Sequence, residues 1–413
     1  MTKKKIVVFG YGQRGSVYAE YATTYRDEYE LVAIIERDEN RIALAKKRCG
    51  NVPVYTDYRQ FIQEKIAADI VVVSTQDEQH PEHAIAMMQA GYDLLLEKPI
   101  ATRREDCITI YETAQKYNRR VVVCHVLRYT PFYSTIKRII DSGEAGEIVT
   151  INASENVGYY HQAHSYVRGP WRNAQTSSPM ILAKCCHDLD ILRYLIGEPC
   201  KSVSSYGGLY YFNEDHAPEG HAQYCSECKY SDCIYKAQTL YTSPGKDWFA
   251  NYFTTKEHAR ENILQDLKHT QYDRCVYACD NDVVDHQVVN AQFAHGKTAS
   301  LTMTAFSSFT YRDIKVHGTK AEIYGVLDGS EIQIRYFGKD WKRVPAEVPS
   351  NIPDGLKGHS GGDFAIMKDL FLYLNGEKTE GISLLDVSLE SHLMCFAAEQ
   401  SRQRQGEVQA IEK

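Results

Sequence analysis

Six residues near the N-terminus constrain the fold of this chain more than any others. A short β-branched run at 5–9 is followed at once by Gly10-Tyr11-Gly12-Gln13-Arg14-Gly15, and then by a helix-like segment at 16–25. A strand, a GxGxxG motif and a helix in this order are typical of a dinucleotide-binding βαβ unit. The first glycine permits the tight turn, the second lets the backbone approach a pyrophosphate, and the third allows close packing of helix on strand. We therefore predict that residues 10–15, Gln13 and Arg14 included, contact the cofactor.

The next strand pattern indicates which dinucleotide binds. Residues 31–35 resemble a buried strand that ends in Glu36, 21 positions after Gly15. An acidic residue at about this distance binds the ribose 2′-hydroxyl of NAD. Glu36 would repel a 2′-phosphate, so NAD is favoured, but the neighbouring Arg37 could pair with that phosphate and leaves NADP open.

Strand and helix patterns alternate up to about residue 125. Buried-strand patterns at 70–75, 93–96 and 121–123 alternate with helical patterns at 38–48, 81–90 and 103–117. This alternation predicts a parallel, doubly wound α/β sheet, a Rossmann domain, over residues 1–125.

The remainder, residues 126–413, has a different pattern and is predicted to be an α+β domain. Helical patterns at 131–140 and 178–197 precede five near-consecutive strand patterns between 283 and 337, which predict an open, mainly antiparallel sheet. Ser178 should cap the second helix, with Pro179 at its first position. The outer face of an open sheet must be covered, so we expect a homodimer or homotetramer.

Composition narrows the classes of partner. The net charge of −7 disfavours nucleic acid and anionic membranes, and the chain has no apolar run long enough for a membrane span. The apolar run at the N-terminus is too short for a signal peptide, so a cytoplasmic location is expected. Twelve cysteines in that compartment favour thiols or metal ligands over disulfides.

A predicted insertion at about 206–280 contains three of these cysteines. Cys225, Cys228 and Cys233 form a C-x2-C-x4-C pattern, and a close cysteine pair is a usual half of a tetrahedral zinc site. Cys275 or Cys279 could supply a fourth ligand, which makes a structural zinc site the hypothesis. Three reduced thiols, an iron–sulfur cluster and a redox dithiol are the alternatives.

The stretch TQDEQHPEHAIAMMQAGYDLLLEKPIA, residues 75–101, resembles the Gfo/Idh/MocA family of NAD(P)-dependent oxidoreductases. In that family a Thr-rich loop with a His follows one strand, and the next strand ends in Glu-Lys-Pro. The resemblance implies that Lys98 lies beside the nicotinamide and the reacting hydroxyl. It also implies that the cofactor pocket is lined by Thr75, Gln76, His80 and Glu97.

The resemblance extends to the helix at 178–197. The family carries a His there with an Asp three residues later, which His187 and Asp190 match. It commonly has another Asp four residues before the His, where this chain has Ala183. Lys184 lies one turn from His187 and could take part in the chemistry. By the same resemblance, the expected substrate-binding residues are Arg128, Tyr129, Asp190 and His359; a plain glycine loop is the alternative for the segment 359–363.

These features predict hydride transfer between a nicotinamide and a secondary hydroxyl of a sugar, glycoside or polyol. The cofactor would supply the redox chemistry, while Lys98 moves the proton and His187 assists. One alternative is glycoside cleavage through transient oxidation and elimination, in which NAD is retained. Another alternative is a non-catalytic NAD-binding regulator, because Ala183 replaces an Asp that is common in the family.

Overall fold

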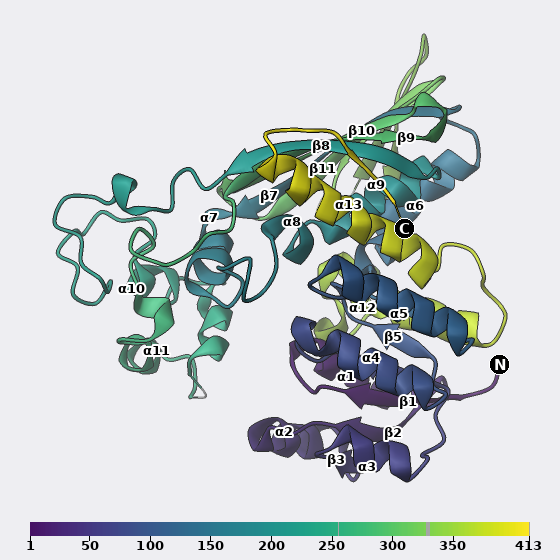
Figure 1. Cartoon of the computed structure of the whole chain (residues 1–413), viewed down its shortest axis with the longest axis horizontal. Helices are drawn as coiled ribbons and strands as arrows, with labels where there is room; N and C mark the ends of the chain where they lie inside the picture. The colour runs from purple at the N-terminus through teal and green to yellow at the C-terminus, as the bar shows by residue number, and fades with distance from the viewer. Residues whose placement is uncertain (255, 328–330, 413) are drawn as a thin grey trace.

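The computed structural model describes residues 1–254, 256–327 and 331–412, and its first domain is a parallel sheet covered by helices (Figure 1). The strand order is β3-β2-β1-β4-β5-β6, and all the pairs are parallel. The order reverses between β1 and β4, and ligands bind at the carboxyl ends of strands at such a point. The predicted doubly wound sheet is confirmed. Its strands are β1 Lys4–Phe9, β2 Tyr29–Ile35, β3 Val54–Tyr55, β4 Ile70–Val73, β5 Leu94–Leu96 and β6 Val121–Val123.

The helices of this domain begin and end close to the predicted positions. Asp38 caps α2 by accepting the N–H of Arg41, as its short side chain predicts. All four residues of β4 are buried because helices cover both faces of the sheet. The helices are α1 Gln13–Thr24, α2 Glu39–Cys49, α3 Tyr58–Gln63, α4 His80–Gln89 and α5 Arg104–Lys116.

The second domain is built on a sheet ordered β14-β13-β12-β11-β7-β10-β9-β8-β15. Its pairs are antiparallel except β7 with β10, so the sheet is mixed rather than purely antiparallel. Side chains along β9 alternate between exposed and buried, which places one face on a hydrophobic core. The strands are β7 Ile148–Gly158, β8 Cys200–Gly208, β9 His286–Phe293, β10 Thr298–Ser307, β11 Tyr311–Gly318, β12 Ala321–Val326, β13 Glu331–Tyr336, β14 Lys342–Pro345 and β15 Gln409–Ala410.

The helix predicted at 178–197 is broken into α8 Met180–Ala183 and α9 Cys186–Ile196. The predicted cap at Ser178 is wrong: its hydroxyl is buried without a hydrogen-bond partner among the described residues, and α8 begins after Pro179. Helix α9 ends where the sequence predicts, because Gly197 takes the left-handed conformation, at φ 76°, that is common after the last turn of a helix.

After β14 the chain returns to the first domain. There α12, Gly362–Leu374, packs on α1, and the hydroxyl of Tyr29 on β2 donates to the carbonyl of Met367. The last helix, α13 Leu385–Gln403, belongs to two cores. Leu389 packs in the first-domain core, whereas Met394 packs in the second-domain core with α6 Pro131–Asp141 and α9.

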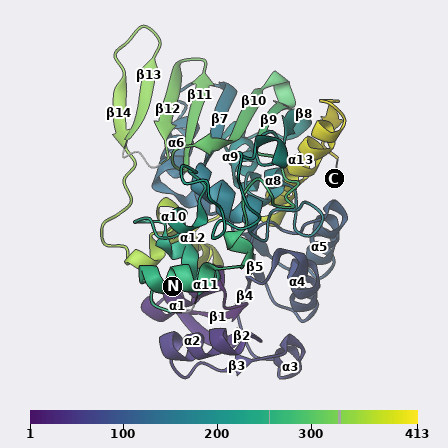
Figure 2. The same ribbon diagram turned by 90° about the vertical axis from the view of Figure 1, so that its left-hand side faces the viewer.

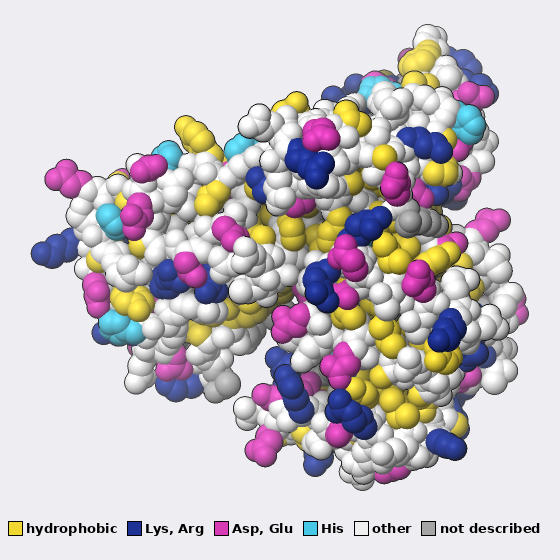
Figure 3. All heavy atoms as spheres, viewed as in Figure 1, with side chains coloured by type: hydrophobic (Ala, Val, Ile, Leu, Met, Phe, Trp, Pro, Cys, Tyr) yellow, Lys and Arg dark blue, Asp and Glu magenta, His cyan; other side chains and the backbone are white. Residues whose placement is uncertain are grey.

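The insertion occupies residues 209–285, between β8 and β9, and projects from the end of the second sheet (Figures 1 and 2). It contains two short helices, α10 Ala237–Leu240 and α11 Arg260–Leu267. Its Tyr252 hydroxyl donates to Oε1 of Gln13 at 3.3 Å, so the insertion reaches the start of α1. Figure 3 shows the surface hollowed between the insertion and the first domain, with acidic and basic side chains intermixed. No helix in the described part of the chain has the length and apolar character needed to cross a bilayer.

Candidate functional site

The glycine turn is crowded by the protein at Gly10 and Gly15, whereas there is open space at Gly12. Gly10 has φ +92°, and a Cβ on Gly15 would lie 1.9 Å from the carbonyl oxygen of Gly10, so neither position tolerates a side chain. A Cβ on Gly12 would meet only Nη1 of Arg41, at 3.8 Å. Helix α1 then starts at Gln13, with no side-chain cap and no acidic residue in its first turn. This arrangement fits a pyrophosphate, because uncapped N–H groups at a helix start bind anions.

Glu36 lies at the end of β2 and supports the same turn. Its carboxylate accepts the N–H of Tyr11 at 2.7 Å and the N–H groups of Arg37 and Asp38 at 2.8 and 2.9 Å. The side chain is therefore held where a ribose would lie beside the turn, with lone pairs left for further donors.

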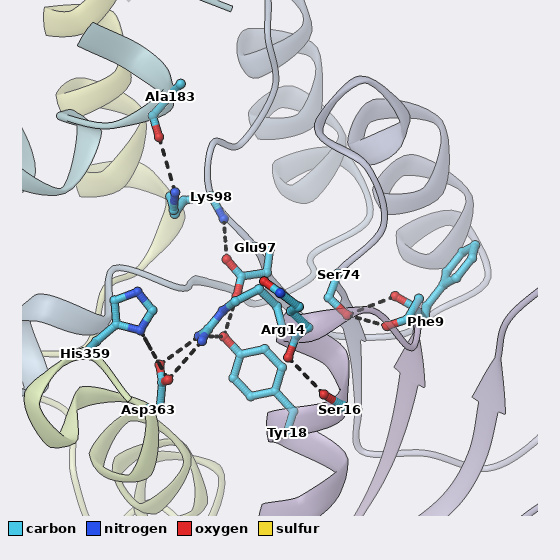
Figure 4. Close-up of polar contacts among 12 residues, drawn as sticks. Phe9, Arg14, Ser16, Tyr18, Ser74, Glu97, Lys98, Ala183, His359 and Asp363 are labelled. Atoms are coloured by element: carbon cyan, nitrogen blue, oxygen red, sulfur yellow. Dashed lines mark hydrogen bonds and ion pairs between the residues drawn. The ribbon is translucent and has the colours of Figure 1, made fainter. Parts of the chain in front are cut away.

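Arg14, in the first turn of α1, lies between two carboxylates. Its guanidinium donates to Glu97 at 2.7 Å and to both carboxylate oxygens of Asp363 at 2.8 and 2.9 Å, and Tyr18 also donates to Glu97 (Figure 4). Burial opposes the charge of Glu97, but Arg14 and its hydrogen bonds outweigh burial and lower the pKa of Glu97. Arg14 and Glu97 thus fasten α1 to β5 and α12, and their contact with a cofactor stays a prediction.

Lys98 follows β5 and reaches the second domain. Its ammonium group donates to the carbonyl oxygen of Ala183 at 3.3 Å, at the end of α8 (Figure 4). His187 begins the next helix, with its Nδ1 buried and unpartnered among the described residues. Burial lowers the pKa of His187 and the charge of Lys98 lowers it further, so the imidazole is neutral. The Lys98 ammonium and the neutral imidazole of His187 therefore lie near each other, between the two domains.

Lys184 has a different environment. Its ammonium lies 3.3 Å from the carboxylate of Glu155, which is fully buried on β7 and also pairs with Arg312 at 2.6 Å. Arg312 in turn donates to Asp188 at 2.7 Å. Lys184 is thus part of a buried charge network, whereas the Lys98 ammonium donates to a neutral backbone carbonyl.

Comparison with known proteins shows to which family the two domains belong. The description "Oxidoreductase family, NAD-binding Rossmann fold" matches residues 4–125, and "Oxidoreductase family, C-terminal alpha/beta domain" matches residues 137–409. The chain belongs to the Gfo/Idh/MocA family. YteT of Bacillus subtilis is 24% identical over 84% of this chain and 83% of its own length. Inositol 2-dehydrogenase 2 of Saccharopolyspora erythraea is 30% identical, over 49% of this chain and 56% of its own length.

Solved structures of similar fold span the whole chain. Levoglucosan dehydrogenase, in complex with NADH and levoglucosan, superimposes with a TM-score of 0.73 at 18% identity, covering 100% of both chains. The WlbA dehydrogenase of Chromobacterium violaceum, in complex with NADH and UDP-GlcNAcA, gives a TM-score of 0.67 at 19% identity over 100% of this chain and 97% of its own. These likenesses confirm the fold of this Gfo/Idh/MocA protein.

The expected cofactor residues of the 75–80 loop differ in exposure. His80 is fully buried, and its Nδ1 bonds the carbonyl oxygen of Pro99 at 2.8 Å. It supports the loop that carries Lys98, and its place in the cofactor pocket stays a prediction. Thr75 bonds Nδ1 of His83 at 2.9 Å and stays partly exposed, and Gln76 is exposed.

Two of the expected substrate residues form a buried ion pair in this Gfo/Idh/MocA chain. Arg128 donates through Nε to Asp190 at 2.6 Å, and its guanidinium lies over the ring of Tyr194. The Tyr129 hydroxyl is equally buried and bonds Ser383 at 2.8 Å. The polar groups of Arg128, Tyr129 and Asp190 thus have partners inside the protein, and their role in binding a substrate stays a prediction.

His359 is better placed for a substrate. It lies 6.1 Å, ring to ring, from His187, and its Nδ1 bonds Asp363 at 3.0 Å. Its side chain is 39% exposed. Asp363 belongs to the segment 359–363 that the resemblance places near the active site, and it joins His359 to Arg14.

The cysteines of the insertion do not form a closed metal site as they stand. Among the described residues, no group of three or more His, Cys, Asp or Glu side chains is arranged to hold a metal ion. All twelve cysteines are free thiols. The expected zinc site is therefore not shown.

Proposed function

We propose that this chain is an NAD-dependent dehydrogenase that acts on a secondary hydroxyl of a sugar, glycoside or polyol. The observation that carries the proposal is the contact of Lys98 with Ala183 at the end of α8, just before the helix that carries His187, whose pKa the Lys98 charge lowers. The names of the inositol and levoglucosan dehydrogenases support the choice of substrate class.

The protein must position the carbinol and remove one proton, because the nicotinamide, when bound, accepts the hydride from carbon. In its neutral form Lys98 takes the hydroxyl proton as the C–H bond breaks. Neutral His187 hydrogen-bonds the same oxygen, and the partly exposed His359 contacts another hydroxyl of the ring. The Lys98 side chain is held by the Ala183 carbonyl, and its neighbour Glu97 is held by Arg14.

A panel of sugars, glycosides and polyols, assayed at 340 nm with NAD and NADP separately, tests the proposal. Substrate-dependent reduction of NAD is the expected result. The contact of Tyr252 with Gln13 favours a second candidate, glycoside cleavage with retained cofactor, because the insertion reaches the cofactor turn. Release of a free sugar without net reduction of NAD would identify that activity, and neither signal with any compound would refute both.

Substitution of Glu36 by Ser should shift the cofactor preference toward NADP. The kcat/KM ratio of NAD to NADP is expected to fall about tenfold or more, since a hydrogen bond to a charged group contributes about 1.5–3 kcal/mol. The wild-type protein should prefer NAD. Steady-state kinetics with both cofactors measures the ratio, and Glu39→Ser, an exposed change on α2, is the matched control. Equal efficiency of the wild type with both cofactors would contradict the role given to Glu36.

We further propose that a second copy of the chain covers the outer face of the second sheet. This face exposes apolar side chains on separate strands, 49% of Val149, 55% of Tyr206 and 38% of Val288. Light scattering should give a mass of two or four chains, and Val288→Asp should lower it while Val408→Asp, at an exposed valine outside these strands, should not. A monomeric wild-type protein at micromolar concentration would exclude this interface.

A further inference from the structure

Four cysteines of the insertion line one small cavity. Cys225, Cys228 and Cys233 come from one loop, and Cys275 comes from a distant segment, around a cavity of about 10 Å³. Backbone pairing brings the segments together: the N–H of Cys225 donates to the carbonyl of Asp273, and the N–H of Cys275 to that of Gln223. This volume fits one water or one ion and no organic ligand.

The cavity has an unusual neighbour in Arg168, which also lines it. Arg168 ends a π-helical segment, Gln162–Arg168, and is fully buried. Its guanidinium donates to the carbonyl groups of Arg274 and Tyr235, each at 2.7 Å, and to the sulfur of Cys225 at 3.5 Å. Its Nη1 is buried and unpartnered in the described part of the chain.

No carboxylate of the described residues pairs with this guanidinium. The other buried arginines, Arg128 and Arg312, each have a carboxylate partner. A buried cation without an anion is strongly destabilising, so a negative charge is expected beside Arg168. The groups available to carry it are the thiols around the cavity.

We propose that this cavity binds one Zn²⁺ through the thiolates of Cys225, Cys228, Cys233 and Cys275, with Arg168 as the compensating cation. Four thiolates and one Zn²⁺ leave an excess of negative charge, which the guanidinium partly offsets. The proposal does not depend on the proposed function.

Zn²⁺ binds thiolates and its binding releases the thiol protons, so a filled site would supply the anion that Arg168 lacks. The four side chains must move closer together to bind the ion, since no three His, Cys, Asp or Glu side chains of the described residues are arranged to hold a metal ion as they stand. Binding of the ion would link the loop of Cys225, Cys228 and Cys233 to the segment of Cys275. This link would make the insertion, which contacts Gln13, more rigid.

Metal analysis of the full chain tests the proposal. The protein should be purified through a tag that binds no metal, without chelator, after growth with added zinc. We expect about one zinc per chain by mass spectrometry of the elements, as for a four-thiolate site. Replacement by Co²⁺ should give intense thiolate-to-metal charge transfer and the visible bands of a tetrahedral site. Absence of metal, octahedral cobalt spectra or a disulfide among these cysteines in never-reduced protein would each overturn it.

Cysteine variants test which of the thiols bind the zinc. Cys228→Ser changes a partly exposed residue and should lose most of the zinc, as should Cys233→Ser. Cys279→Ser is the matched control, because Cys279 lies four residues after Cys275 but does not line the cavity. Arg168→Met should weaken zinc retention against a competing chelator more than Arg168→Lys does. Full zinc in folded Cys228→Ser, or equal loss in Cys279→Ser, would refute the ligand set. If the variants do not fold, the cobalt spectrum of the wild type still decides.

Discussion

Replacing Lys98 with Met should slow hydride transfer by about 10²–10⁴-fold, the usual effect of removing a general acid or base. Met keeps the length of the side chain but cannot take a proton. NAD should still bind, because the phosphates face the glycine turn and the start of α1, which Lys98 does not contact. Single-turnover absorbance at 340 nm measures the step, and quenching of protein fluorescence measures NAD binding.

Lys184→Met is the matched control for this experiment. Lys184 pairs with Glu155 in the buried network, so its loss should lower stability more than it lowers the rate per folded molecule. His187→Ala should slow the step less than Lys98→Met, since His187 only orients the hydroxyl. Near-normal turnover by Lys98→Met would assign the proton transfer elsewhere. A rate loss for Lys184→Met as large as that of Lys98→Met would show that Lys184 has taken over the role of the Asp that Ala183 replaces.

Substitution of Asp190 by Ala should lower the free energy of unfolding by about 3–5 kcal/mol, because it leaves the buried guanidinium of Arg128 without its partner. The two side chains are 3% and 1% exposed, so water cannot compensate. Urea unfolding followed by circular dichroism measures the change. The Michaelis constant for the substrate should stay near the wild-type value in the folded fraction.

An exposed pair supplies the control. Asp106→Ala breaks the contact with Arg103 at the start of α5, and exposed pairs contribute less than about 1 kcal/mol. A double variant, Arg128→Met with Asp190→Leu, should recover much of the lost stability, since apolar side chains can replace a buried pair. If Asp190→Ala instead left stability unchanged and raised the Michaelis constant, Asp190 would be a substrate ligand after all.

The first domain could be predicted closely from its sequence because its signals are local. The glycines at 10, 12 and 15 act through their own backbone, and the buried strands form continuous apolar runs. Asp38 caps the helix that it directly precedes. Lys98 was located by the three-residue block in which it lies, without reference to distant parts of the chain.

The polar partners could not be predicted in the same way. Arg14 and Asp363 are separated by 349 positions, and no local pattern indicates that they meet. Arg128 and Asp190 were assigned to the substrate by the resemblance, and no local pattern indicates that they pair with each other. The break between α8 and α9 could not be predicted either, because the apolar pattern of α8 continues into α9. At the break, Lys184 pairs with Glu155 on β7, which is a distant part of the sequence.

The shared helix α13 bears on how the two domains can move. Leu389 and Met394 lie little more than one turn apart, yet each belongs to the core of a different domain. Rotation of one domain about a hinge would pull this helix out of one core and expose apolar surface to water. The domains should consequently unfold in a single transition and hold a constant separation through the reaction cycle. Opening of the active site for exchange of bound molecules then falls to the insertion, whose hydrogen bond from Tyr252 to Gln13 of the first domain can break without disturbing either core.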